Sequence, residues 1–491
     1  MRVKTNAFDK YSGQTNDLMY FYTGKSETIF LLRSRMFVFP LLYFSAFLKA
    51  IKDIFNKNPQ GGLLFIIFGL PIYITTLSIL NETGYQSLIF VFQPFKEIII
   101  LAMLAVVLWG LKEKIRFHVI DYCVAGYLLY TGFYVFLPLG DFGFTERLLA
   151  FKNTSFFTLI YFAGRLTDPR TLQISKYFHF ILIVAISAAI LAIYEATSDQ
   201  HFQSLTGYSD YVFDFFGQEK EGDYGLTWTF QRDADGLKRF ASYFSDPLEH
   251  ASATLLSICV IVALFTKKNN AFNPTRLGII ALAASFVSLF FTLSRSSTVS
   301  FCLIIYVYAL ITRKKYVLHT SHALIALGFI YIGILLENTD LYDYLISTIT
   351  LQEASALGHL IAWIEGMTAI ISNPFGLGLG MSGRVATSLG STIGGENQFI
   401  VLGVQVGVVA VLLYIFIHFA IISYSYKWFP HLEGKERMVA LCIFLLKVGI
   451  TLPLFTASLD SFSYITYINW FLSGVFVHMI MRKENINHLL P

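Results

Sequence analysis

Long apolar stretches, separated by short polar segments, recur along most of the chain. Twelve of them approach or exceed the roughly 20 residues that a helix needs to cross a bilayer. They lie near residues 61–80, 90–110, 119–138, 149–165, 175–195, 247–266, 276–293, 296–312, 317–336, 397–424, 437–457 and 463–481. Only helices and closed barrels satisfy their backbone polar groups in lipid. The pattern therefore predicts an all-α, polytopic integral membrane protein with about 12 transmembrane helices.

A shorter apolar run, residues 36–48, follows a basic N-terminal stretch. It contains Pro40 and is flanked by arginine and lysine, so we expect an interfacial helix rather than a further span. No apolar stretch begins before about residue 29, and no small-residue cleavage site follows the basic residues. We therefore predict no cleaved signal peptide and treat residues 1–60 as a cytoplasmic arm.

Basic residues occupy every second connector between the apolar runs. The positions are Lys112, Lys114, Arg116, Lys267, Lys268, Arg276, Arg313, Lys314, Lys315, Lys427, Lys435 and Arg437. Because lysine and arginine favour the cytoplasmic side, both termini, including the tail at 482–491, should be cytoplasmic. The spans then fall in residues 61–195, 247–336 and 397–481, and two long loops, 196–246 and 337–396, face outward, which in a bacterial inner membrane is the periplasmic side.

Composition narrows the class of protein further. Of the 491 residues, 55% are hydrophobic and only 14% are charged, whereas a soluble domain carries roughly 25% charged residues. The net charge of +4 is distributed over short clusters, which argues against nucleic-acid binding. The four cysteines lie in different apolar runs without CxxC spacing, so neither a disulfide framework nor a metal site is predicted.

The second outward loop combines an amphipathic helix with a glycine-rich stretch. Apolar residues at helical spacing predict a helix lying on the membrane surface, and Asn373-Pro374 should end it. These residues are Leu357, Leu360, Ile361, Ile364, Met367 and Ile371. The stretch NPFGLGLGMSG follows at 373–383. Its glycines could let backbone amides approach a ligand, or they could form a flexible turn.

Two arginines near the outward side are candidates for binding an anion. Arg295 stands between two apolar runs, at the outer membrane boundary, where a cation needs a partner or an anionic ligand. The alternative is that it reaches lipid headgroup phosphates. Arg239 lies just before the span near 247, and Asp246 is either part of the same site or the N-cap ahead of Pro247.

Topology places Arg239, Arg295, His359, Arg384 and Glu396 on the same side of the membrane. Guanidinium groups bind phosphate oxygens in bidentate fashion. With a carboxylate or an imidazole beside them, they fit a reaction in which a lipid diphosphate leaves and a sugar hydroxyl attacks.

These residues lie in motifs that resemble the O-antigen polymerase and ligase family, the Wzy-type polymerases and WaaL-type ligases. Four patterns occur in the family's order across residues 239–415. They are RFASYFSDP from residue 239, LSRSS from 293, GHLIAWIEGMTAIISNPFGLGLG from 358 and ENQFIVLGVQVGVVAVLLY from 396. The resemblance implies a membrane glycosyltransferase of the GT-C type that uses an undecaprenyl-diphosphate-linked oligosaccharide as donor, with no metal or nucleotide cofactor.

The resemblance also implies roles for single residues. Arg295 corresponds to the arginine of the family's Ser-Arg motif and Arg239 to the one before the earlier span, both expected to hold the diphosphate. His359 stands where relatives often have arginine, and Glu396-Asn397 where they have a His-Asn pair. The general base is therefore Glu396 or His359, and the missing histidine favours polymerase over ligase.

The sequence thus predicts polymerisation of lipid-linked repeats by metal-independent glycosyl transfer. Arg384 is a further candidate diphosphate ligand, and Asn397, Trp363 and Asp246 are expected to contact or support the glycan. Membrane lipid surrounds the protein, and a chain-length regulator and a flippase are the protein partners expected. Two other classes stay open, a scaffold without catalysis and a transporter, for which Lys447 and His418 are the main ionisable residues within spans.

Overall fold

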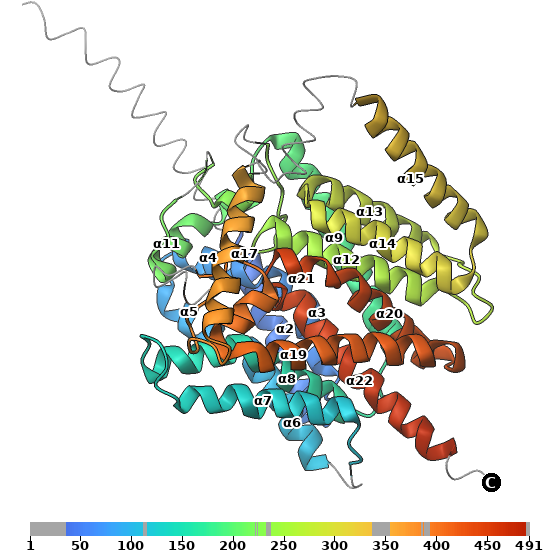
Figure 1. The fold of residues 1–491 in the computed structure, drawn as a ribbon, viewed down its shortest axis with the longest axis horizontal. Helices are drawn as coiled ribbons and strands as arrows, with labels where there is room; N and C mark the ends of the chain where they lie inside the picture. The colour runs from blue at the N-terminus through green and yellow to red at the C-terminus, as the bar shows by residue number, and fades with distance from the viewer. Residues whose placement is uncertain are drawn as a thin grey trace, which may run out of the picture.

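The computed structural model describes residues 36–110, 115–220, 222, 224–231, 237–335, 354–383, 386 and 393–487. Over these residues the chain is built of helices, and its only β-pairing is two isolated bridges, so the predicted all-α class is confirmed. Figure 1 shows most of the long helices side by side in one bundle.

The main helices are α2 (Val38–Phe55), α3 (Gly61–Phe68), α4 (Tyr73–Glu82), α5 (Gln86–Phe92), α6 (Phe95–Gly110), α7 (Val119–Phe136), α8 (Phe144–Leu166), α9 (Ile174–Ser198), α11 (Tyr208–Phe216), α12 (Pro247–Phe265), α13 (Arg276–Thr292), α14 (Arg295–Thr312), α15 (Lys315–Leu335), α17 (Ala354–Ser372), α19 (Gln398–Trp428), α20 (Gly434–Thr451), α21 (Pro453–Thr456) and α22 (Ser463–Asn487).

Nine helical stretches within the described part of the chain are long and apolar enough to cross a membrane. They are Gly61–Glu82, Gln86–Gly110, Val119–Phe136, Ile174–Ser198, Pro247–Phe265, Arg295–Thr312, Gln398–His431, Gly434–Thr456 and Ser463–Lys483. The three other predicted spans coincide with α8, α13 and α15. The protein is therefore a multi-pass membrane protein, as predicted.

Helices α12 and α22 form the centre of the bundle. In each, 89% of the most apolar stretch is buried by other parts of the protein. Helix α22 packs closely on α8 because Gly164 and Gly474 face the partner backbone, and a Cβ at either position would collide with a backbone oxygen. Small residues permit this close approach between membrane helices, where there is no hydrophobic driving force to bring them together.

Helix α2 is longer than the apolar run that predicted it, since it has 18 residues and continues through Lys49 to Phe55. One face packs on the bundle, where the ring of Phe47 stacks on Phe95 at 3.7 Å between centroids. The opposite face exposes Leu41 and Leu42. An exposed apolar face suits contact with lipid, so the interfacial placement of this helix stays a prediction.

The predicted cytoplasmic connectors meet at one end of the bundle. Lys268 forms an ion pair with Glu433, and the Arg437 guanidinium donates to Asn270 Oδ1 at 2.6 Å. Lys435 Nζ donates to the carbonyl of Arg170 at 2.7 Å. These contacts agree with the alternation of basic connectors. We call this the inner end of the bundle and the opposite one the outer end.

Candidate functional site

Arg239 and Arg295 lie at the same turn of the outer end. The Nε of Arg239 donates to the carbonyl of Thr292, the last residue of α13, at 3.0 Å. The backbone of Phe240 is fixed alongside, since its N–H donates to Phe291 O at 3.0 Å. Leu293 adopts a left-handed conformation, with φ 48°, and α14 begins two residues later with the exposed Arg295. The structure thus brings the first two patterns of the resemblance together.

The buried carboxyl group of Glu195 accepts a hydrogen bond from the segment 239–247 and so fixes its backbone. Glu195 of α9 is fully buried, and its two oxygens accept from Ser242 N and Phe202 N, each at 2.8 Å. Ser242 is itself left-handed, with φ 55°, so the chain turns sharply at this point. Glu195 was not among the predicted site residues. An acidic residue near the end of an apolar run was the only local signal.

A second set of hydrogen bonds, from Thr75 and Gln203, fixes the carbonyl groups of the same segment. Thr75 Oγ1 donates to Tyr243 O at 2.9 Å, and Gln203 Nε2 donates to Thr75 Oγ1 at 3.1 Å and also to Phe244 O. Asp246 is the N-cap of α12, where one carboxylate oxygen accepts from Leu248 N at 2.8 Å and from the next amide at 2.9 Å. These bonds match the capping alternative for Asp246.

The second outward segment begins with α17. Five of its six predicted apolar positions are exposed, with Ile371 at 72%. In Figure 1, α17 runs across the direction of α7, α8 and the long part of α19. Both features fit the prediction of a helix along the membrane surface with an apolar face toward lipid. His359 lies exposed on this helix.

The glycine stretch is used to complete a broken helix. Helix α19 is interrupted at Gly407, where φ is 78° and ψ is 179°. The N–H of Leu377 donates to Val404 O at 2.7 Å, and that of Gly378 donates to Gln405 O at 3.0 Å. In return, Val408 N donates to Pro374 O at 2.9 Å. These hydrogen bonds satisfy backbone groups that the break would leave without partners. Residues 374–378 are therefore ordered and hold the two parts of α19 in place.

Glu396 and Asn397 stand at the start of α19. Asn397 is the N-cap of the helix, and its Oδ1 accepts from Phe399 N at 3.0 Å. Glu396 is exposed, and its carbonyl accepts from Ser458 Oγ at 3.1 Å. Ser458 follows α21, which also packs against α14, the helix that Arg295 begins. The carboxylate and the two arginines are therefore at the same end of the bundle.

Two further predicted site residues are Trp363 and Arg384. Trp363 of α17 is partly buried, and its Nε1 has no hydrogen-bond partner among the described residues. Arg384 lies outside the residues that the structure describes.

Sequence reasoning missed a partly buried acid, Asp460, which lies next to the start of α19. Asp460 accepts from Trp470 Nε1 at 3.2 Å, and its backbone N–H donates to Gln398 Oε1 at 3.4 Å. Burial raises the pKa of the Asp460 carboxyl, against the lowering effects of its hydrogen bonds and of Lys447. Lys447 is fully buried, with Nζ 3.6 Å from the centroid of the Trp470 ring. The lysine, noted in the sequence as a mark of transport, thus has an acid and an aromatic ring beside it.

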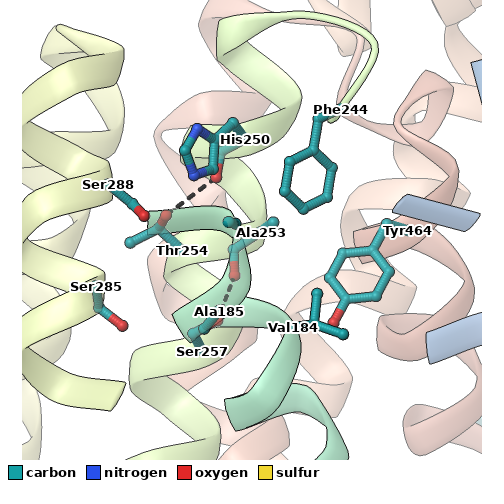
Figure 2. Close-up of a pocket in the computed structure, with 11 residues that line it drawn as sticks. Val184, Ala185, Phe244, His250, Ala253, Thr254, Ser257, Ser285, Ser288 and Tyr464 are labelled. Carbon is teal, nitrogen blue, oxygen red and sulfur yellow. Dashed lines mark hydrogen bonds between the residues drawn. The ribbon is translucent and has the colours of Figure 1, made fainter. Parts of the chain in front are cut away.

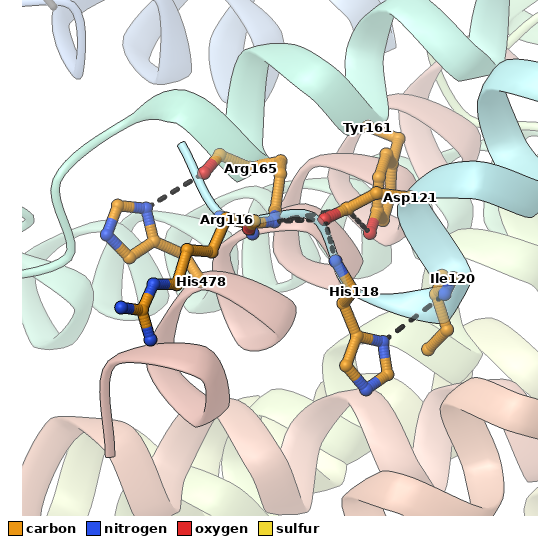
Figure 3. A network of polar contacts seen from close by, with 7 residues as sticks. All are labelled: Arg116, His118, Ile120, Asp121, Tyr161, Arg165 and His478. Carbon is orange, nitrogen blue, oxygen red and sulfur yellow. Dashed lines mark hydrogen bonds and ion pairs between the residues drawn. The ribbon is translucent and has the colours of Figure 1, made fainter. Parts of the chain in front are cut away.

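A second polar cluster lies at the inner end (Figure 3). Arg165 Nε lies 3.0 Å from both oxygens of Asp121, and Tyr161 donates to the same carboxylate at 2.6 Å. The arginine side chain is 5% exposed and the aspartate is fully buried. His478 contacts the carbonyl of Arg165 at 2.8 Å. A buried pair with these partners joins α7, α8 and α22 and leaves little surface for a ligand.

The described chain is thus a helical membrane protein with arginines and a carboxylate gathered at its outer end. Residues 280–415 match the family model described as O-Antigen ligase, which confirms the resemblance to the O-antigen polymerase and ligase family. The match includes Arg295, His359 and Glu396 but not Arg239. No curated protein matches the chain. A glycosyltransferase-like enzyme that acts on lipid-linked glycans is the class that this family implies.

Proposed function

We propose that the protein polymerises oligosaccharide repeats carried on undecaprenyl diphosphate, on the periplasmic face of the inner membrane. The observation that carries this proposal is the meeting of Arg239 and Arg295 at the turn between α13 and α14. Two arginines at one turn suit the binding of a diphosphate, because guanidinium groups chelate phosphate oxygens in pairs.

The reaction needs one bond broken, one formed and one proton moved. A hydroxyl of the acceptor glycan attacks the anomeric carbon of the donor, and the bond from that carbon to the diphosphate oxygen breaks. Arg239 and Arg295 stabilise the charge that develops on the departing lipid diphosphate. Glu396 takes the proton of the attacking hydroxyl, and its exposure at the start of α19 leaves it open to an acceptor. His359, exposed on α17, is the other candidate base.

Ligase activity is the second candidate function. The matching family model is described as O-Antigen ligase. A ligase transfers the glycan to a different acceptor, the core of lipid A. Glu396 in place of the family's histidine favours the polymerase. Both activities use the same donor and the same leaving group, so the arginine roles are common to them.

Complementation of a polymerase-deleted strain tests the proposal. The variants are Arg239→Ala, Arg295→Ala and Glu396→Gln, with Arg170→Ala as a matched control because Arg170 is an exposed arginine at the inner end. Wild type and the control should restore long glycan chains on a gel, and the three variants should leave single repeats at equal protein levels. Activity retained after loss of both outer arginines would contradict the site. A strain lacking the protein that leaves its glycans unattached to lipid A core would identify a ligase.

A further inference from the structure

An open hollow lies at the inner end of the bundle, where α19 and α22 end. It is lined by Lys427, Trp428, His431 and Lys483. Its volume, counted for the centre of a water-sized sphere, is about 340 Å³, whereas the pocket beside Phe244 at the outer end (Figure 2) has about 10 Å³ by the same measure. Small-molecule sites occupy roughly 300–1,000 Å³, so the inner hollow has room for a ligand and the outer pocket does not.

Positive charge predominates around this hollow. Lys427, in the last turn of α19, is exposed and forms no ion pair within the part of the chain that the structure describes. The Nζ of Lys483 lies 3.4 Å from Glu436 Oε2. Glu433, an acid in the preceding turn, is already paired with Lys268. The lining lysines and Glu436 together therefore carry one net positive charge, which suits an anionic ligand.

The hollow lies at the level of lipid headgroups. Two of the helical stretches that can cross a membrane end at residues that line it, one at His431 and the other at Lys483. Tryptophan is enriched at the boundary between membrane and water, and lysines at the ends of spans extend toward this boundary. Trp428 and the two lysines are therefore at the depth where the phosphate group of a phospholipid lies.

An exposed apolar stripe follows α19 to the hollow. Its side chains are between 48% and 59% exposed and recur every three, four or seven residues, so they share one face of the helix. They are Leu412, Phe416, Phe419 and Tyr426, the last of which directly precedes Lys427. In a bilayer such a face packs against acyl chains. A soluble anion would make no use of this stripe, whereas a phospholipid has both the chains for the stripe and the charge for the hollow.

We propose that the hollow binds the headgroup of an anionic phospholipid, whose phosphate is attracted by Lys427 and Lys483 and whose acyl chains lie along the exposed face of α19. Lysine binds phosphate as a point charge, and basic pockets between membrane helices bind anionic headgroups. The site does not rest on the proposed function, because it lies at the opposite end of the bundle from Arg239 and Arg295.

Lipid binding to the purified full-length protein in neutral detergent tests this site. The affinity of the first bound phosphatidylglycerol is measured by mass spectrometry of intact protein–lipid complexes. A lysine near an anionic membrane surface contributes about fivefold to affinity, so Lys427→Ala and Lys483→Ala should each weaken binding by about this factor. Phosphatidylcholine, which has no net charge, should bind more weakly than phosphatidylglycerol. Lys267→Ala is the matched control and should bind like wild type, because Lys267 is an exposed lysine at the same end that does not line the hollow.

Glu436→Gln separates an effect of charge from a loss of structure. Removal of this carboxylate should tighten the binding of phosphatidylglycerol, whereas damage to this end of the bundle would weaken it. Equal affinities of wild type and the two lysine variants would overturn the proposal. Equal binding of phosphatidylcholine, or weaker binding by Glu436→Gln, would overturn it as well. Displacement of the lipid by an equal concentration of glycerol phosphate would assign the hollow to a soluble phosphate instead.

Discussion

Replacing Glu195 by glutamine tests how the segment that carries Arg239 is held in place. The two carboxylate oxygens accept from two backbone amides, those of Phe202 and Ser242, each at 2.8 Å. A carboxamide has one oxygen and one NH2 group. It can therefore accept from only one of these amides, and its NH2 group faces the other donor.

The expected loss follows from these two effects. One buried hydrogen bond, which contributes about 0.5–1.5 kcal/mol, is removed, and a buried N–H left facing a donor costs about 1–3 kcal/mol more. We expect the free energy of unfolding to fall by about 3 kcal/mol in all. Because Ser242 is three residues from Arg239, the proposed glycosyltransferase activity should fall as well, beyond what the loss of folded protein explains.

Asp199→Asn is the matched control at the end of the same helix. The Asp199 side chain is 82% exposed and pairs with Lys238 at 2.7 Å, so its loss should cost at most about 1 kcal/mol. Both variants would be unfolded from detergent micelles by denaturant, with wild type alongside. A loss for Glu195→Gln below about 1 kcal/mol, or equal to that of the control, would refute the reasoning that the carboxylate anchors the segment.

Three further predictions concern stability and use the same unfolding assay. Burial lowers the pKa of His201 to about 4, whereas the unfolded imidazole titrates near 6.5. Between these values the unfolded chain binds more protons, so the free energy of unfolding should fall as the pH is lowered from 6.5 to 4. His201→Phe should reduce this pH dependence. Gly407→Ala should cost about 3 kcal/mol or more, because its Cβ would strike a backbone carbonyl, whereas Gly434→Ala, with φ 54° and open space around it, should cost about 1–2 kcal/mol. Asp121→Ala should cost about 3–5 kcal/mol, because it leaves the buried Arg165 without its acid, whereas Asp210→Ala, at a half-exposed ion pair, should cost at most about 1 kcal/mol. Similar costs for the two aspartate variants would contradict the role of burial. Similar costs for the two glycine variants would contradict the role of the clash.

The helices and the gathering of the outer arginines were predictable from local sequence. Hydropathy is a property of each stretch by itself, so all twelve apolar runs coincide with helices in the described chain. The alternation of basic connectors predicted which helix ends share a side. Topology alone then placed Arg239 and Arg295 on one face, and the fold adds that they meet at a single turn.

The residues that fix the site could not be predicted in the same way. Glu195 and Asp460 bind groups far away in the sequence or across a loop, and no spacing rule relates them to their partners. The break in α19 was also missed, because an apolar stretch that contains Gly407 has the hydropathy of a continuous span. The span predicted at 397–424 is therefore a 31-residue helix in two parts, divided at Gly407.

The break at Gly407 changes how mutations in the glycine stretch should be interpreted. In lipid, the carbonyls freed by a break need donors from the protein, and the amide of Gly378 and the hydroxyl of Tyr130 supply two of them at 3.0 and 2.9 Å. A side chain at Gly376, where φ is 81°, would meet the same stretch of α19 backbone. We therefore expect Gly376→Ala to lose stability and activity together, whereas Arg295→Ala should lose activity and keep its unfolding midpoint. An inactive Gly376→Ala protein with wild-type stability would restore the ligand-binding interpretation of this stretch.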